Sequence, residues 1–231
     1  MATHSQQHSD ATCVKVDEEL EAFVTTINQS ELCSIASSLR EGKLCTVGER
    51  LGGDFNILFH LHFEDGTTWL ARFPLPKYPA IRLKSEIATM KYVQQHSNIP
   101  VPEVYAYDSN PDNPVGVPYI LMSKLPGSNL APKWEDLNDI GKRKVLGQIA
   151  DLMMELSSHR FPKIGSLLSS ELDEYHVDQL VTFYTVDRGT YDLTFNHGPY
   201  SMSSEFYLAM ANVNLIATLQ QHIGTSGKEY G

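Results

Sequence analysis

Apolar and polar residues alternate in the middle of the chain with the period of a β-strand. Four apolar side chains stand at every second position: Ile57, Phe59, Leu61 and Phe63. This period is typical of a strand that packs mainly on one face. Asp65-Gly66 follows and favours a hairpin turn of type I′, because glycine tolerates the positive φ that this turn requires. The pattern therefore predicts an antiparallel hairpin.

Four further runs predict the rest of a sheet. Strand signals cover residues 44–51, 67–73, 103–107 and 118–123. A helical pattern over residues 80–95 follows the third strand, with Ile87, Met90 and Val93 as inward candidates. We therefore expect five strands with one helix between the third and the fourth.

Two short helices are expected before the sheet. Asp17 is placed to cap the first, and Ser30 is placed to cap the second. Gly42 offers a natural stop for the second helix. Their apolar stripes have helical spacing and consist of Leu20, Phe23, Val24 and Ile27, then Leu32, Ile35, Ala36 and Leu39.

Beyond Pro126-Gly127 the pattern becomes helical. One stripe consists of Leu146, Ile149, Met153 and Leu156, and a second helix is predicted over residues 203–222. We expect these helices to leave apolar surface exposed and to favour self-association.

Composition limits the classes of partner. The chain of 231 residues has 42% hydrophobic and 20% charged residues, which supports a packed core, and its net charge is −10. That charge disfavours nucleic acid or an acidic membrane as the main partner. No apolar run reaches the roughly 20 residues of a membrane span.

Cysteine usage and the N-terminus favour a reducing compartment. Cys13, Cys33 and Cys45 are widely spaced and odd in number, so we expect neither a disulfide framework nor a zinc site. Residues 1–10 are polar and lack the apolar region of a signal peptide. We therefore predict a cytoplasmic protein.

A glycine pair between the first two strands is the first candidate for chemistry. Backbone N–H groups in Gly52-Gly53-Asp54-Phe55-Asn56 can approach phosphate oxygens where no Cβ intervenes. The alternative is a purely structural hairpin turn.

Arg72 is the second candidate. It stands between Ala71 and Phe73 on an apolar strand, where a cation is costly unless it is paired. Glu86 on the following helix is a plausible partner, and such a pair can hold a cation against the α- and β-phosphates of a nucleotide. The alternative is that Arg72 faces the edge of the sheet and its guanidinium lies in water.

Two other features allow a binding role. The backbone after Met122, at the end of the last strand, can contact an adenine edge, although a core strand with a Pro-Gly turn explains the same residues. His60 and His62 share one strand face with the spacing of two metal ligands. No third ligand is visible in the sequence, so we expect these histidines to lie at the surface or between the two lobes.

The ordered combination of these stretches resembles the aminoglycoside phosphotransferase/choline kinase-like family, and especially its fungal branch. The resemblance covers residues 20–222 and rests on LGGDFNILFHLHFEDGTTWLARFP, SEIATMKYV, NIPVPEVYAYD and NPVGVPYILMSKLPGSNL. It implies an α+β, protein-kinase-like fold with a five-stranded antiparallel N-lobe sheet and one helix. It also implies ATP, Mg²⁺ and phosphoryl transfer to the hydroxyl of a small molecule.

Carried over by position, the resemblance implies a cofactor site and a domain plan. The nucleotide loop is Gly52, Gly53, Asp54, Phe55 and Asn56; the phosphate-binding cation and its partner are Arg72 and Glu86; the adenine linker includes Met122, Ser123 and Leu125. We expect a flexible tail over residues 1–15, a nucleotide-binding N-lobe with its preceding helices over 16–126, and a partial helical C-lobe over 127–231.

The catalytic pattern of the family is missing from the sequence. The family has His-x-Asp with an Asn five residues beyond the Asp, followed by a second metal-binding Asp. Neither His8-Ser9-Asp10 nor His176-Val177-Asp178 has that Asn, so we assign no catalytic residue and no Mg²⁺ ligand. We expect a small-molecule kinase homologue that is truncated before the catalytic loop and inactive as this chain. The alternative is a non-catalytic nucleotide-binding or interaction protein with a degraded kinase fold.

Overall fold

The chain divides into two compact units. A computed structural model describes residues 18–52, 55–76, 80–170, 174–181 and 196–226. The sheet unit is drawn from Met1–Pro76 and Val104–Lys124, and the helical unit from Lys77–Glu103 and Leu125–Gly231. The tail expected over residues 1–15 and the cap expected at Asp17 lie outside the described residues.

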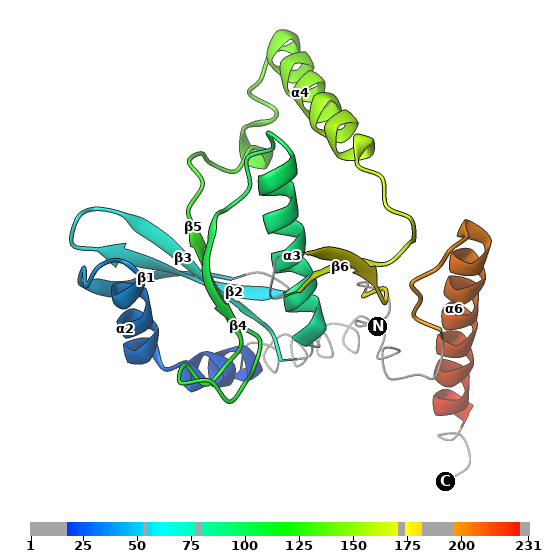
Figure 1. Ribbon diagram of the computed structural model, residues 1–231, viewed down its shortest axis with the longest axis horizontal. Helices are drawn as coiled ribbons and strands as arrows, with labels where there is room; N and C mark the ends of the chain where they lie inside the picture. The colour runs from blue at the N-terminus through cyan, green and yellow to red at the C-terminus, as the bar shows by residue number, and fades with distance from the viewer. Residues whose placement is uncertain (1–17, 53–54, 77–79, 171–173, 182–195, 227–231) are drawn as a thin grey trace, which may run out of the picture. The chain divides into compact units, whose positions relative to one another are not determined.

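The sheet unit is built on five antiparallel strands. They are β1 (Cys45–Gly52), β2 (Asn56–Phe63), β3 (Thr68–Pro74), β4 (Val104–Asp108) and β5 (Tyr119–Ser123). Their order across the sheet is β1-β2-β3-β5-β4 (Figure 1). A helix between the third and fourth strands completes the predicted order, and the α+β class is confirmed.

The turn between β2 and β3 differs from the predicted type. Gly66 has a φ of 82°, whereas Asp65 is not among the residues with positive φ, so the turn is not of type I′. The N–H of Gly66 donates to the carbonyl of Phe63 at 2.9 Å, and Oδ1 of Asp65 accepts from the N–H of Thr67 at 3.0 Å. The aspartate side chain thus bonds the turn locally and only the glycine needs the left-handed conformation.

Two helices cover one face of the sheet and form the core with it. A helix over residues 18–26 precedes α2 (Gln29–Leu39). The core consists of Ile27, Leu32, Ala36, Ile57, Phe59, Leu61, Phe63, Trp69, Ala71, Phe73, Val115, Val117, Tyr119 and Leu121. All four alternating positions of β2 are in this set, so the predicted face of that strand is confirmed.

The ends of α2 show one correction. The N-cap is Asn28, whose side chain accepts from the N–H of Glu31 at 3.1 Å, so the cap predicted at Ser30 was wrong. Ser30 lies inside the helix because the capping asparagine stands immediately before Gln29. At the other end Gly42 has a φ of 80°, and its N–H donates to the carbonyl of Ser37 at 2.9 Å, as expected of a helix stop.

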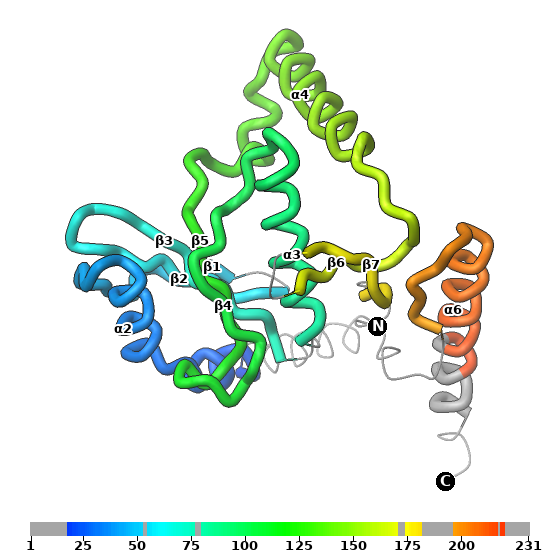
Figure 2. The backbone as a smooth tube through the Cα atoms, in the orientation of Figure 1, coloured from blue at the N-terminus to red at the C-terminus, as the bar shows by residue number. Residues whose placement is uncertain are grey.

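The helical unit contains a small hairpin that the sequence did not indicate. Its elements are α3 (Ala80–His96), the short helix η1 (Ala131–Lys133), α4 (Asp139–Ser158), β6 (Ser166–Ser169), β7 (Tyr175–Asp178) and α6 (Ser203–Ser226). Strands β6 and β7 pair with each other, and β6 packs on α3 (Figure 2). Each strand has only four residues, which is too short for a period to be recognised.

The predicted stripe of α4 is exposed. Leu146, Ile149, Met153 and Leu156 are between 46% and 66% exposed, and no residue of α4 is buried. Leu208, Leu215 and Leu219 of α6 are exposed as well. The expectation that these helices leave apolar surface open is therefore confirmed for the described part of the chain. No helix in that part has the length and hydropathy needed to cross a membrane.

Candidate functional site

Arg72 lies on the face of the sheet opposite the core helices. Its neighbours Ala71 and Phe73 are buried in the core, and successive side chains of a strand point to opposite faces. Arg72 is in register with Leu58 of β2 and with Ile120 of β5. Arg72 is half-buried as a residue and has an apolar residue beside it on each neighbouring strand. This setting favours an anionic partner for its guanidinium.

The predicted adenine linker begins on the same face. Met122 is buried and pairs with Leu70, two residues from Arg72, so Met122 and Arg72 share a face. Ser123 pairs with Trp69 and therefore points to the core side. Leu125 is 41% exposed and belongs to the helical unit. Of the three linker residues, Met122 is the one whose side chain the structure puts on the Arg72 face.

The predicted phosphate loop joins β1 to β2. Gly52 is the last residue of β1 and pairs with Ile57, and Asn56 opens β2 opposite Pro74. The carbonyl of Phe55 accepts from the N–H of Leu75 at 3.1 Å, which holds one end of the loop to β3. Gly53 and Asp54 lie outside the described residues.

Neither packing nor backbone conformation requires a glycine at position 52. Its φ is not in the left-handed region, and a Cβ built on it meets no atom of the described residues within 4 Å. An alanine fits at this position without strain. The space beside Gly52 is therefore open to the approach of a ligand.

Glu86 lies on α3, between two residues whose side chains are buried. Leu83 and Ile87 are buried, and Glu86 is half-buried. Arg72 belongs to the sheet unit and Glu86 to the helical unit. The Arg72–Glu86 pair therefore stays a prediction.

The two histidines of β2 have a third polar neighbour that sequence reasoning missed. Oε2 of Glu49 lies 3.2 Å from Nε2 of His62 and 3.5 Å from Nδ1 of His60. The histidine rings stack with their centroids 5.8 Å apart. His60 is only 8% exposed, which contradicts the surface alternative for this residue and leaves the interlobe alternative as a prediction.

A β-bulge brings Glu49 to the histidines. The register of β1 against β2 shifts between Val47 and Arg50, and such a bulge redirects a side chain. The pKa of Glu49 is lowered, first by its own backbone N–H and then by His62. Gly48 is the one residue in the sequence that could have indicated this bulge, because a glycine inside a strand often marks one. The described residues hold no group of three or more His, Cys, Asp or Glu side chains arranged to bind a metal ion.

Comparison with known proteins identifies the family to which the chain belongs. The model of the family described as "Phosphotransferase enzyme family" matches residues 49–194, which is more than half of the chain. The match includes β2, β3, α3, β4 and β5, and it supports the resemblance noted from the sequence and a kinase-like N-lobe fold.

Named relatives are fungal. A subtelomeric hrmA-associated cluster protein of Aspergillus fumigatus is 36% identical over 137 residues, which cover 58% of this chain and 27% of the relative. Altered inheritance of mitochondria protein 9, mitochondrial, of Zygosaccharomyces rouxii is 39% identical over 98 residues, covering 39% and 16%. The Saccharomyces cerevisiae protein of that name is 30% identical over 153 residues, covering 61% and 23%. The chain thus spans about a quarter or less of the length of these relatives.

The names of these relatives overturn the predicted location. Proteins from several yeasts carry the name altered inheritance of mitochondria protein 9, mitochondrial. The cytoplasmic location predicted from the sequence is contradicted by this finding. The polar residues 1–10 argued only against a secretory signal, and mitochondrial targeting segments are amphipathic rather than strongly apolar.

Proposed function

Because the chain belongs to the phosphotransferase enzyme family, we propose that it is a homologue of small-molecule kinases whose sheet unit binds ATP. The observation that carries this proposal is the position of Arg72. It stands half-buried on the sheet face opposite the core, between Leu58 and Ile120, with Met122 on the same face. A fixed cation beside an apolar strand suits a ligand that has both a phosphate chain and a flat base.

Each part of the site has a role in this proposal. Arg72 contacts the phosphates, and Glu86 holds its guanidinium. Backbone N–H groups of residues 52–56 approach the phosphate oxygens, for which the open space beside Gly52 is needed. The strand end at Met122 contacts the adenine.

The residues of the proposed site suit ATP better than they suit the Mg²⁺ that accompanies it. The nucleotide finds a cation, backbone donors and an apolar strand in the sheet unit. Mg²⁺ prefers carboxylate and other oxygen ligands, and the described residues contain no cluster of acidic or histidine side chains that suits a metal ion. We therefore assign no step to the metal and no catalytic residue to this chain.

It follows that these 231 residues bind ATP weakly and do not transfer its phosphate. Phosphoryl transfer in kinase-like enzymes depends on an Asp that orients the hydroxyl and on an Asn and Asp that hold the metal. The sequence has no His-x-Asp with Asn at the required spacing. This absence also favours the second candidate function, a non-catalytic nucleotide-binding or interaction protein.

Calorimetric titration of the full chain with Mg-ATP tests the proposal. We expect weak saturable binding that is reduced at least fivefold in Arg72→Ala and in Glu86→Gln. Arg50→Ala is the matched control, because Arg50 pairs with Glu21 and is in register with the core residue Phe59, which puts it on the core face. Equal binding by all four proteins would reject the site.

ADP formation tests the claim that this chain does not transfer phosphate. The chain is incubated with Mg-ATP and a panel of small alcohols, and ADP is measured. No turnover above the buffer control is expected. Sustained turnover that is lost in Arg72→Ala would contradict the claim that this chain is inactive and would favour the kinase.

A further inference from the structure

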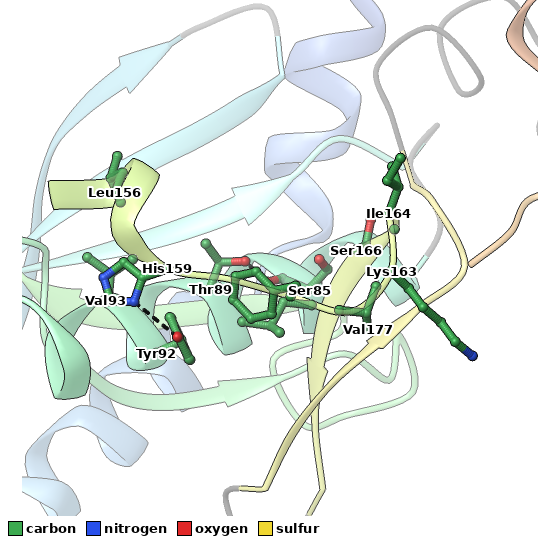
Figure 3. A pocket seen from close by; sticks show the side chains of 13 residues that line it. Ser85, Thr89, Tyr92, Val93, Leu156, His159, Lys163, Ile164, Ser166 and Val177 are labelled. Carbon is green, nitrogen blue, oxygen red and sulfur yellow. Dashed lines mark hydrogen bonds between the residues drawn. The ribbon is translucent and has the colours of Figure 1, made fainter. Parts of the chain in front are cut away.

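The helical unit contains a cavity that shares no lining residue with the proposed nucleotide site. Its volume is about 430 Å³, which lies within the usual range for small-molecule pockets. Its 13 lining residues come from α3, from the end of α4 and from residues 161–167 and 177 (Figure 3). All of them belong to the helical unit.

One wall of the cavity is a cluster of rings around Tyr92. The ring centroid of Tyr92 lies 5.3 Å from that of His159 and 5.3 Å from that of Phe161. His96 stacks on the Tyr92 ring from outside the lining, with centroids 4.3 Å apart. Rings held on several sides keep their orientation, and they offer flat surfaces to a second ring.

The polar group of the cavity is a hydrogen-bonded pair. The hydroxyl of Tyr92 lies 3.1 Å from Nδ1 of His159, as the dashed line in Figure 3 shows. If the hydroxyl donates, Nε2 of the neutral imidazole carries the proton and the tyrosine oxygen still accepts. If Nδ1 donates, Nε2 accepts and the hydroxyl is free to donate. In either tautomer the pair offers one donor and one acceptor.

Two other hydroxyls of the lining are already hydrogen-bonded to the backbone. The hydroxyl of Thr89 donates to the carbonyl of Ser85 at 2.8 Å, and the hydroxyl of Ser166 accepts from the N–H of Val181 at 2.9 Å. Lys163 is the one lysine or arginine among the described lining residues, and its amine points away from Tyr92 and His159 (Figure 3). None of these 13 described residues is an aspartate or a glutamate.

From this chemistry we infer that the cavity binds a neutral, ring-containing small molecule with one hydroxyl or amide group. The ring packs on Tyr92 and Phe161, and the hydroxyl or amide both donates to and accepts from the Tyr92–His159 pair. A charged ligand is disfavoured, since the described lining residues include no carboxylate and the amine of Lys163 is directed elsewhere. The inference does not depend on nucleotide binding.

Three benzene derivatives of similar size test the ligand class. Benzamide is neutral, benzoate is an anion and benzylamine is a cation at pH 7. The full chain with labelled methyl groups is titrated with each compound and followed by NMR. We expect benzamide to bind with a Kd on the order of 1 mM and to shift the methyl signals of Val93 and Val177, which line the cavity and do not belong to the stripe of α4. We expect at least fivefold weaker binding of the two ions.

A conservative variant tests the polar pair. Tyr92→Phe keeps the ring and removes the hydroxyl, so it should weaken benzamide binding about fivefold and leave toluene binding unchanged. Tyr207→Phe is the matched control, because Tyr207 is exposed on α6 and is not a lining residue. This control should bind both compounds like the unmodified chain.

Three outcomes would overturn the inference. One is that none of the compounds shifts the lining methyl signals. Another is that benzoate or benzylamine binds as tightly as benzamide. The third is that benzamide shifts only residues on the exposed stripe of α4, such as Ile149, which would mean adsorption to open apolar surface.

Discussion

Glu49 on β1 and His62 on β2 are joined across the first hairpin by a contact of 3.2 Å between Oε2 and Nε2. Gly48 makes this contact possible, since a Cβ at that position would overlap the imidazole of His62. The bulge between Val47 and Arg50 therefore combines a displaced carboxylate with a glycine that leaves room for its partner. The same hairpin carries the proposed phosphate loop at its tip.

Substitution of Gly48 should therefore disturb the hairpin more than substitution of Gly52. Gly48→Ala forces the His62 ring, which is 44% exposed, to swing away from Glu49, and we expect it to lower the free energy of unfolding by about 1 kcal/mol. Gly52→Ala meets open space and should change it by less than about 0.5 kcal/mol. Urea denaturation of both variants makes the comparison. Equal losses would contradict this description of the bulge.

The pKa of Asp65 provides a test of the β2–β3 turn. It is lowered to about 2, first by the N–H of Thr67 and then by Arg40. The folded-state value lies below the unfolded value of about 3.9, so the stabilisation by Asp65 is complete above pH 4 and is lost as the pH falls towards 2. Arg40→Gln should raise this pKa but leave it below its ordinary value, because the bond from Thr67 remains. Carboxyl ¹³C titration gives the midpoint, and an unchanged midpoint would argue against the ion pair.

Helix α2 should be an integral part of the sheet unit. Leu32 is 0% exposed and packs in the core, so Leu32→Ala is expected to cost about 2–5 kcal/mol of unfolding free energy. Leu39 on the same helix is 48% exposed, and Leu39→Ala should cost less than about 1 kcal/mol. Thermal and chemical denaturation measure both. A small loss in Leu32→Ala would mean that α2 is not needed for the core.

The exposed stripe of α4 should drive self-association. Met153 is 66% exposed in a stripe of apolar side chains, and exposed apolar patches favour association. Met153→Glu should shift the sedimentation profile towards monomer. Gln148→Glu adds the same charge away from the stripe and should leave the profile unchanged. If both variants sediment alike, net charge and not the stripe controls association.

The regular parts of the fold followed from local patterns. The alternation at Ile57 and Phe59 predicted the buried face of β2, because every second side chain of a strand points to the same face of the sheet. The cap at Asn28 was missed in favour of Ser30, since both residue types cap helices and local sequence does not rank them. Strands β6 and β7 were missed because four residues carry no readable period.

Only those features of the candidate site that depend on the strands themselves could be predicted from the sequence. The face of Arg72 followed from its place between two core residues. The approach of Glu49 to His60 and His62 depends on a bulge, and the Tyr92–His159 pair joins residues 67 positions apart. Contacts of this kind arise from tertiary packing, which local patterns in the sequence do not reveal.

The phosphate dependence of binding at Arg72 tests the central claim most directly. The chain and Arg72→Ala are titrated with ATP, ADP and adenosine under the same conditions. If Arg72 contacts the α- and β-phosphates, the substitution weakens ATP and ADP binding by about tenfold, as expected for a charged hydrogen bond, and leaves adenosine binding unchanged. Equal weakening of all three ligands, or no change in any, would contradict the assignment of this sheet face as a nucleotide site.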